Sequence, residues 1–453
     1  MKATIPGPTY REMLYPESLP TALRSKALAA RAQEFDPANL CNITWRAPDG
    51  HIRHVTLPRE LTGVEANIIV LIGCDFPSGS HKVGPAYVTL MESELAGEIS
   101  PGANTMIGPS TGNFGIGVAY ISKLKGYPAI VIMPEHMSAE RYQRIRHYGG
   151  ALDLTPGSES DVILVLERTE QYKEDARYKI LGQFELLPNY RFHRYVTGGS
   201  ALEVAARYGN GCVAAFVAAP GSAGTLGAAD EIKARFPDCQ VAAPEPRECA
   251  TLFNNSSGTH RIEGIGDKMV TLIHNVLTTD YVVLVHDDDC IRGLELVEQR
   301  QTLVEKILRL PEDFLRPFRG LFGISSICNI LASIRMARHL HLGPKDNVVT
   351  VATDGFDRYS SVLADLARRE APLEERKLQR WFDAVFRGGD AQEILDVRPR
   401  EQKERLFRYK EETWTRFHYS LAYLEKLKSQ SFWDAEVAKI PEIDSALIRA
   451  REL

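Results

Sequence analysis

Three polar, glycine-rich segments carry the side chains best suited to chemistry, and each follows a short apolar run. The first is PSGSHKVGP, residues 77–85, in which Lys82 stands where a helix is expected to begin. The partial positive charge of a helix N-terminus lowers the pKa of a lysine amine placed there. The neutral amine is the form that makes a Schiff base with a carbonyl compound. Lys82 is therefore a candidate nucleophile, with a surface lysine after a turn as the alternative.

The second segment is GPSTGNFGIG, residues 108–117, between an expected strand and an expected helix. Free backbone amides and small hydroxyls at a helix N-terminus bind a carboxylate or a phosphate. Ser110, Thr111 and Gly112 supply such groups, and Asn113 adds a donor and an acceptor at the tip. The pattern indicates an anion site, with an ordinary strand-to-helix turn as the alternative.

The third segment, PGSAGTLGAA, spans residues 220–229 and also lies between an expected strand and an expected helix. Its small residues allow backbone amides to surround a phosphate; they are Gly221, Ser222, Ala223, Gly224 and Thr225. The loop lacks both the lysine of GxxxxGK[ST] and the pattern GxGxxG, which disfavours nucleotide hydrolysis and dinucleotide binding. It suits a cofactor phosphate that is held and never transferred.

Strand-like and helix-like runs alternate around these loops. Apolar runs of strand length occur at 66–73, 104–108, 129–133, 151–155, 212–219, 239–246 and 348–353, and helical patterns occur at 114–127, 138–150, 226–236 and 325–343. This alternation is typical of parallel sheets that helices cover on both faces. The sequence therefore predicts two open parallel-sheet α/β domains with a cofactor cleft between them.

Four regions are expected along the chain. They are an N-terminal extension that leads into the core (1–79), a smaller α/β domain with the substrate loop (80–194), a larger α/β domain with the phosphate loop (195–366) and a helical C-terminal extension (367–453). The last region is charged, helical in pattern and poor in strands.

The composition disfavours several classes of protein. Lys plus Arg is 54 and Asp plus Glu is 59, without the basic excess typical of nucleic-acid binding. The seven cysteines form no CxxC pair, which argues against a disulfide framework and a zinc ribbon. We find neither a signal-peptide core nor ~20 consecutive apolar residues. We expect a cytoplasmic protein that binds no membrane and no nucleic acid.

Metal binding is not expected from the remaining polar clusters. The acidic triplet Asp287, Asp288 and Asp289 predicts a solvated turn. The histidine pairs in HIRH (51–54) and HLHLG (339–343) have no carboxylate or cysteine at ligand spacing.

A Schiff-base lysine, a carboxylate loop and a phosphate loop together describe pyridoxal phosphate binding. With these motifs the sequence resembles the fold type II pyridoxal-phosphate enzymes, the group of cysteine synthase, cystathionine β-synthase, threonine dehydratase and the tryptophan synthase β subunit. The resemblance covers roughly residues 36–366 and includes MPEHMSAERYQRIRHYGG (133–150), IEGIGDK (262–268) and GISS (323–326).

The resemblance implies roles for individual residues. GSHK resembles the Schiff-base motif, so Lys82 should bind pyridoxal 5'-phosphate covalently. STGNFG (110–115) resembles the loop that binds the substrate carboxylate, and Asn113 should contact the 3'-oxygen of the cofactor. Gln183, in QF (183–184), should also hold the carboxylate. GSAGT (221–225) resembles the phosphate loop GTGGT.

The sequence departs from the family pattern at several positions. Val83-Gly84-Pro85 replaces the Asp-Arg that follows the lysine in cysteine synthase, and Asn329 is unusual just after GISS. TVATDGFDRYSS (350–361) resembles the segment that meets the cofactor ring nitrogen, with Thr353 or Asp354 opposite it. Thr353 is favoured because the family uses hydroxyl partners, which leaves Asp354 to point to solvent or to cap the turn.

The resemblance implies chemistry at the β-carbon of a small amino acid. The expected function is β-elimination or β-replacement through an aminoacrylate, as in cysteine synthase, with a thiol or sulfide as nucleophile in a homodimeric enzyme. A serine or threonine dehydratase, or a lyase of the cysteine desulfhydrase type, is the alternative chemistry. A non-catalytic protein that kept the scaffold is the alternative of another class, and Lys82 argues against it.

Overall fold

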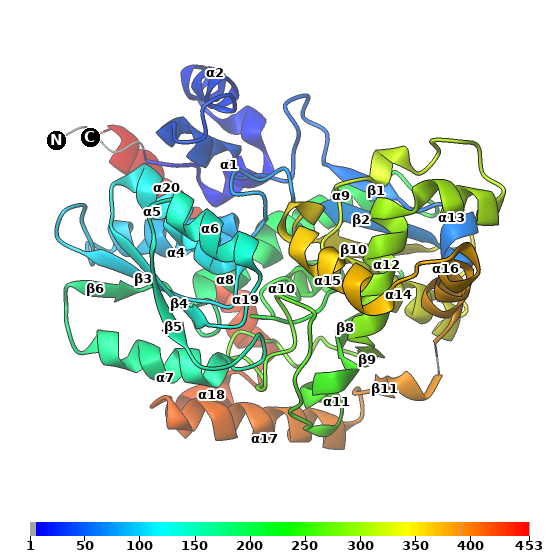
Figure 1. Cartoon of the computed structure of the whole chain (residues 1–453). Coiled ribbons are helices and arrows are strands. Elements are labelled where there is room, and N and C mark those ends of the chain that lie inside the picture. The colour runs from blue at the N-terminus through cyan, green and yellow to red at the C-terminus, as the bar shows by residue number, and fades with distance from the viewer. Residues whose placement is uncertain (1–5, 390, 453) are drawn as a thin grey trace.

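Two parallel sheets organise the chain in the computed structural model, which describes residues 6–389 and 391–452 (Figure 1). The smaller sheet has the order β5-β4-β3-β6 and is parallel throughout. The larger has the order β1-β2-β10-β7-β8-β9-β11, with parallel inner strands and antiparallel edges. The predicted fold class is confirmed.

The strands are β1 (His54–Thr56), β2 (Asn67–Ile72), β3 (Thr105–Pro109), β4 (Ala129–Pro134), β5 (Ala151–Thr155), β6 (Tyr178–Ile180), β7 (Ala215–Val217), β8 (Gln240–Pro246), β9 (Tyr281–Val285), β10 (Asn347–Ala352) and β11 (Ile394–Asp396). The α-helices before residue 310 are α1 (Tyr10–Leu14), α2 (Thr21–Ala30), α3 (Arg59–Thr62), α4 (Val83–Leu95), α5 (Asn113–Lys125), α6 (Ala139–His147), α7 (Val162–Lys173), α8 (Leu187–Phe192), α9 (Gly198–Ala205), α10 (Gly227–Arg235), α11 (Thr251–Asn254), α12 (Asp287–Gln299) and α13 (Gln301–Leu308). Those after it are α14 (Ile324–His339), α15 (Ser360–Glu370), α16 (Glu375–Phe382), α17 (Arg400–Arg416), α18 (Leu421–Lys426), α19 (Gln430–Ala438) and α20 (Ile440–Glu452).

The expected regions do not follow the sheets at either end of the chain. β1 and β2 come from the range 1–79, yet they pair within the larger sheet, β2 with β10 in parallel. β11 comes from the C-terminal extension and pairs antiparallel with β9 at the opposite edge. Strand pairing is long-range in sequence, so a boundary read from composition alone could not place these strands.

The acidic triplet at 287–289 does not form a solvated turn, and that prediction is wrong. Asp287, Asp288 and Asp289 form the first turn of α12, where the helix N-terminus favours negative charge. Asp287 is buried and accepts hydrogen bonds from the backbone and side chain of Arg261. Within residues 6–389 and 391–452, no group of three or more His, Cys, Asp or Glu could hold a metal ion.

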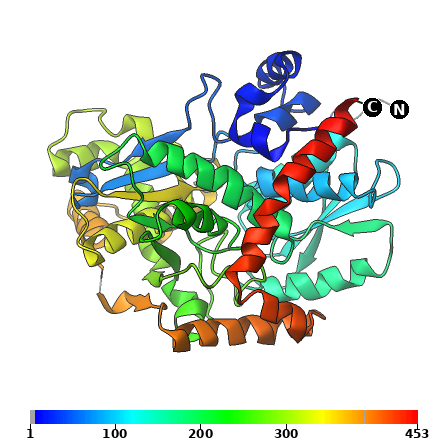
Figure 2. The ribbon, with the colours of Figure 1, turned by 180° about the vertical axis from the view of Figure 1, so that it is seen from behind.

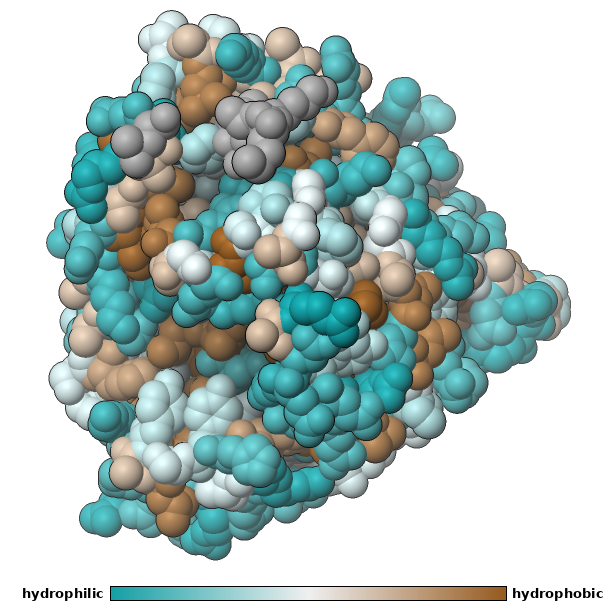
Figure 3. Space-filling model, turned by 90° about the vertical axis from the view of Figure 1, so that its left-hand side faces the viewer, coloured by the Kyte–Doolittle hydropathy of each residue, from teal (hydrophilic) through white to brown (hydrophobic). Residues whose placement is uncertain are grey.

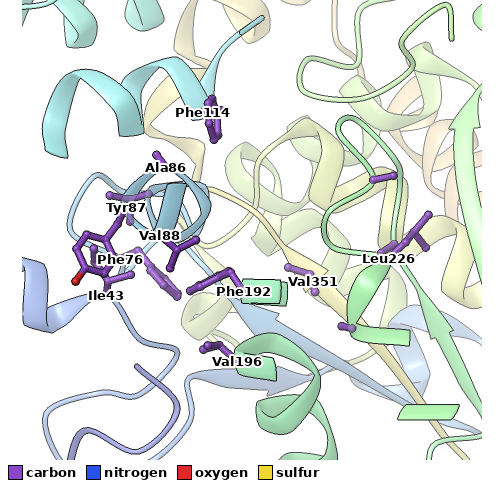
Figure 4. Close-up of a cluster of buried hydrophobic side chains, with 14 of the residues drawn as sticks. Ile43, Phe76, Ala86, Tyr87, Val88, Phe114, Phe192, Val196, Leu226 and Val351 are labelled. Atoms are coloured by element: carbon purple, nitrogen blue, oxygen red, sulfur yellow. The ribbon is translucent and has the colours of Figure 1, made fainter. Parts of the chain in front are cut away.

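Helix α4 begins directly after the candidate lysine, and buried apolar side chains pack against it. Val88 of α4 lies in a cluster with Phe76 and Phe192 (Figure 4). A Cβ at Gly84 would lie 2.2 Å from Cζ of Phe192. Gly84, one of the residues that depart from the family pattern after the lysine, therefore has a packing role. Only glycine leaves room for the Phe192 ring against the first turn of α4.

The C-terminal extension runs beneath both sheets and returns to the N-terminal segment. In Figure 1, α17 lies along the lower edge, and in Figure 2 α20 crosses the opposite side toward the two termini. Asp444 of α20 accepts hydrogen bonds from the backbone amides of Tyr10 (2.8 Å) and Arg11 (3.0 Å). The extension is thus packed onto the core.

Helix α17 holds the segment that precedes β9. Trp414 Nε1 donates to the carbonyl oxygen of Val270 at 2.9 Å, and Lys410 Nζ donates to that of Leu272 at 3.1 Å. In the same segment, Thr271 Oγ1 donates to the carbonyl oxygen of Ser222 at 2.8 Å. The extension therefore supports the phosphate loop through one intervening segment.

None of the described helices is long and apolar enough to cross a membrane. On the face in Figure 3, hydrophobic residues lie in separate patches among hydrophilic ones.

Candidate active site

Lys82 lies at the N-terminus of α4 and reaches across to the larger sheet. Its side chain is buried, and Nζ donates a hydrogen bond to Oγ of Ser222 at 3.2 Å. Burial lowers the pKa of Lys82 to about 8, against the opposing charges of Asp267 and Glu159. Desolvation is thus the main cause of the lowered pKa of Lys82. From the sequence, the helix N-terminus was the expected cause. The amine is available to react close to neutral pH.

The rate at which the cofactor-free protein binds pyridoxal phosphate covalently is expected to follow the titration of Lys82. Only the neutral amine attacks, so below the pKa the rate should rise about tenfold per pH unit. It should level off near the pKa of about 8. Rapid-mixing absorbance measurements across this range test the prediction. A rate that keeps rising toward the ordinary lysine value of 10.5 would contradict it.

The loop after β3 has one residue that shapes it and two whose side chains cross to other segments. Oγ of Ser110 accepts hydrogen bonds from the amides of Gly112 (3.0 Å) and Gly115 (2.9 Å). Thr111 Oγ1 donates to Glu159 Oε1 at 2.5 Å, and Asn113 Nδ2 donates to Asp354 Oδ2 at 2.7 Å. The Ser110 hydroxyl thus folds the loop, whereas Thr111 and Asn113 reach into the site.

Gln183 meets the same end of the smaller sheet. Its side chain is buried, and Nε2 donates to the carbonyl oxygen of Pro109, the last residue of β3, at 3.3 Å. Thr111 follows two residues later. The structure therefore brings together the two residues expected to bind a substrate carboxylate, at the carboxyl end of parallel strands where ligands of open α/β sheets bind.

The phosphate loop joins β7 to α10 and turns sharply at Ala223, whose φ is 63°. A single left-handed residue of this kind occurs in the backbone turns, called nests, whose amides bind anions. Ser222 Oγ accepts hydrogen bonds from Asn189 Nδ2 (3.0 Å) and from the amide of Gly224 (3.3 Å). Thr225 is also buried, next to the start of α10. The loop fits the phosphate of a cofactor attached to Lys82.

Two glycines of this loop have no space for a side chain. A Cβ at Gly221 would lie 2.3 Å from the carbonyl oxygen of Gly264, and one at Gly224 would lie 2.2 Å from Oδ1 of Asn189. Asn189 also donates to the carbonyl oxygen of Gln183 at 2.8 Å. The space that a Cβ of Gly224 would need is therefore occupied by Asn189, which connects the phosphate loop to Gln183.

Replacing Gly224 with valine is expected to release the cofactor. The added side chain displaces Asn189 and opens the phosphate loop, so hydrogen bonds to a charged group are lost. Each is worth about 1.5–3 kcal/mol, roughly 10- to 150-fold in affinity. Loss of absorbance on dialysis measures the effect. Gly343→Val is the matched control, because its nearest neighbour lies 3.8 Å away; equal retention by both variants would contradict the prediction.

Asp354 is fully buried in the site, and the expectation that it points to solvent is wrong. Oδ2 accepts hydrogen bonds from Asn113 and, at 2.8 Å, from the Tyr359 hydroxyl, whereas Oδ1 has no hydrogen-bond partner among the described residues. Thr353 is only partly buried, and its carbonyl oxygen accepts from the amide of His81 at 3.2 Å. The geometry favours Asp354 as the polar group available to a ligand.

Asn329 stabilises the larger sheet. Its Oδ1 accepts from the amide of Ala219 and its Nδ2 donates to the carbonyl oxygen of Val351, both at 2.8 Å. The side chain thereby ties the end of β10 to the residue just before the phosphate loop. The unusual residue after GISS thus has a structural explanation.

Sequence reasoning gave no role to several buried charged residues of the site. Arg141 is fully buried, donates to the Tyr359 hydroxyl at 3.1 Å and pairs with Glu263. Asp267 and Glu159 are also buried and interact with the charge of Lys82. Arg141 and Asp267 lie in motifs quoted above without a role, and nothing in the sequence singled out Glu159.

A buried lysine whose amine contacts a glycine-rich loop is an arrangement that suits a pyridoxal-phosphate enzyme. Residues 55–307, more than half of the chain, match the family described as Pyridoxal-phosphate dependent enzyme. The chain belongs to this family, and its cofactor is pyridoxal phosphate.

Individual relatives agree with this assignment. A cysteine synthase of Staphylococcus aureus is 31% identical over 297 residues, covering 65% of this chain and 88% of that protein. A probable cysteine synthase of Bacillus subtilis is 30% identical over 286 residues, covering 63% and 85%. Among solved structures, the O-acetyl serine sulfhydrylase isoform 3 of Entamoeba histolytica superimposes with a TM-score of 0.60 at 26% identity, covering 73% of this chain and 92% of that one.

Proposed function

We propose that the protein catalyses β-replacement on a small amino acid, with a sulfide or thiol as nucleophile. The observation that carries the proposal is the buried Lys82, whose amine contacts Ser222 of the phosphate loop and whose charge interacts with Glu159, the hydrogen-bond partner of Thr111. The relatives described as cysteine synthase and O-acetyl serine sulfhydrylase support the same chemistry. β-Elimination without replacement, as in a dehydratase or a desulfhydrase, is the second candidate.

When bound, pyridoxal phosphate supplies an electron sink for negative charge at the substrate α-carbon. Thr111 and Gln183, at the end of β3, would hold the substrate carboxylate. The Lys82 amine, neutral near its pKa of about 8, removes the α-proton as general base and later returns it. Asn113 and Asp354 would provide polar contacts to the cofactor ring, and residues 221–225 would hold its phosphate.

A product screen separates replacement from elimination. The holoenzyme is given serine, cysteine, O-acetylserine or threonine, each with and without sulfide. A thiol-bearing amino acid that forms only with sulfide supports replacement, whereas a keto acid and ammonia formed equally in both conditions would show elimination. No reaction with any of these substrates would refute the proposal.

Thr111→Val and Gln183→Ala are expected to weaken amino-acid binding while the cofactor stays attached. Each loses a hydrogen bond to a charged carboxylate, worth about 1.5–3 kcal/mol or roughly 10- to 150-fold in affinity. Titration of the amino-acid-induced absorbance change gives the affinities. Thr169→Val is the matched control, since Thr169 is buried in α7 and donates only to the carbonyl oxygen of Val165. Wild-type affinity in both site variants would overturn the assignment.

The domain bounds, the cellular location and the oligomeric state of the protein are also proposals. We place the substrate domain at 80–194 and the phosphate domain at 195–366, the latter completed by β1 and β2. We propose a cytoplasmic homodimer, in line with the free state of all seven cysteines. Light scattering of the purified holoenzyme would test the dimer.

A further inference from the structure

A buried segment without helix or strand, residues 269–276, connects the phosphate loop to the C-terminal extension. This connecting segment lies between α11 and β9, and each of its residues is buried. Carbonyl groups that are buried outside helices and sheets need hydrogen-bond donors from elsewhere in the chain. The position of the connecting segment therefore depends on the donors that its carbonyl oxygens meet.

Helix α17 supplies donors to alternate carbonyl oxygens of the connecting segment. Trp414 Nε1 donates to the oxygen of Val270 at 2.9 Å. Lys410 Nζ donates to those of Leu272, at 3.1 Å, and His274, at 2.5 Å. The two donors are four residues apart, on one face of the helix, and each is only 1% exposed. One face of α17 thus holds the backbone of the connecting segment at every second residue.

The residues between these carbonyl groups bind the elements that would surround the cofactor phosphate. Thr271 Oγ1 donates to the carbonyl oxygen of Ser222, in the phosphate loop, at 2.8 Å. Asn275 Nδ2 donates at 2.9 Å to Oδ2 of Asp230, in the first turn of α10. Because α10 follows the phosphate loop directly, the connecting segment contacts both the loop and the helix N-terminus that ends it.

The donors of α17 therefore affect the phosphate loop through the backbone between them. A buried carbonyl group that loses its donor raises the free energy of the folded state, so the connecting segment shifts to find another partner. Thr271 lies between two of the carbonyl groups that α17 binds, at Val270 and Leu272, and it shifts with them. The carbonyl of Ser222 then loses its donor as well.

We propose that Lys410 and Trp414 are positioning residues for the cofactor phosphate. Acting through Thr271, they fix the backbone at Ser222 and so the direction of the amides of residues 221–225. Both residues lie outside residues 55–307, the part of the chain that matches the family. The proposal needs pyridoxal phosphate as the cofactor, and it is independent of the reaction that the enzyme catalyses.

The test is a double-mutant cycle on the affinity for pyridoxal phosphate, measured by absorbance titration of the full-length cofactor-free protein. Lys410→Met keeps an unbranched apolar chain but has no N–H, and its dissociation constant should rise at least ~10-fold, the value of one hydrogen bond to a charged group. Thr271→Val keeps the branched shape without the hydroxyl and should have an effect of the same order. The combined variant should bind no more weakly than the weaker single variant, because both changes break one connection.

Lys403→Met is the matched control on the same helix. Lys403 Nζ also donates to backbone carbonyl oxygens, those of Val276 at 2.7 Å and Leu277 at 3.2 Å, beyond Thr271 and Asn275. This variant should lower the melting temperature of the protein, as Lys410→Met does, but should keep the wild-type affinity for pyridoxal phosphate. If it loses the cofactor as strongly as Lys410→Met, general loosening of the extension is the cause and the inference is overturned.

Trp414→Phe provides a milder variant that keeps the measurement possible if Lys410→Met does not fold. It retains an aromatic ring and removes only the donor to Val270, so the affinity should fall in the same direction. Wild-type affinity in Trp414→Phe and in folded Lys410→Met would overturn the inference, as would losses that multiply in the combined variant. Neither result would affect the proposed β-replacement, which the substrate screen tests on the wild-type holoenzyme.

Discussion

Lys82→Ala is expected to give a protein that neither becomes yellow with pyridoxal phosphate nor turns over any amino acid. The lysine is both the attachment point and the base for the α-proton. Loss of a general base alone costs about 10²- to 10⁴-fold, and the loss of covalent attachment adds to it. Absorbance of the reconstituted protein and a product assay measure both effects.

Reduction with borohydride followed by peptide mapping identifies the attachment site in the wild-type protein. Lys410 provides an internal control, because it is buried and burial lowers its pKa to about 7. Its amine, however, donates to the carbonyl oxygens of Leu272 and His274, outside the phosphate loop. The label should be found on Lys82 alone. A label on Lys410 would show that a low pKa, and not the site, selects the lysine.

Asp354→Asn is expected to lower turnover about 10- to 150-fold, the value of a hydrogen bond to a charged group. The carboxylate is buried, and its free Oδ1 can hold a protonated ring nitrogen by a charge-assisted hydrogen bond. A neutral amide cannot stabilise that proton. The nitrogen-15 shift of the cofactor ring should therefore change from protonated to neutral in Asp354→Asn.

Two further variants separate this role from packing. Thr353→Ala should keep both turnover and the nitrogen-15 shift, because the contribution of Thr353 seen here is through its carbonyl oxygen. Tyr359→Phe removes one hydrogen bond to Asp354 but leaves the carboxylate in place. It should alter activity far less than Asp354→Asn does. Loss of activity in Thr353→Ala with retention in Asp354→Asn would restore the hydroxyl partner that the family pattern suggests.

Local pattern was sufficient for most elements of the core. The apolar runs at 129–133 and 348–353 correspond to β4 and β10, and the helical pattern at 325–343 corresponds to α14. These segments succeed because all three are buried, so each is a largely apolar run, and the length of the run separates the helix from the strands. The sequence did not predict the short strands β1 and β11, because three-residue edge strands carry almost no periodicity.

By itself, the sequence determined the cofactor class and the residues that form the three loops. GSHK, STGN and GSAGT are contiguous motifs whose chemistry depends on residue type and local turn geometry. Only the tertiary structure showed that Asp354, and not Thr353, is the fully buried polar group. It also placed β1, β2 and β11 in the larger sheet. The charges of Glu159 and Asp267 act on Lys82 only because the fold brings these segments together. These facts depend on burial and on contacts between segments far apart in the chain. Desolvation sets the pKa of such groups, and because it is a property of the folded interior, the spacing of residues in the sequence does not predict it.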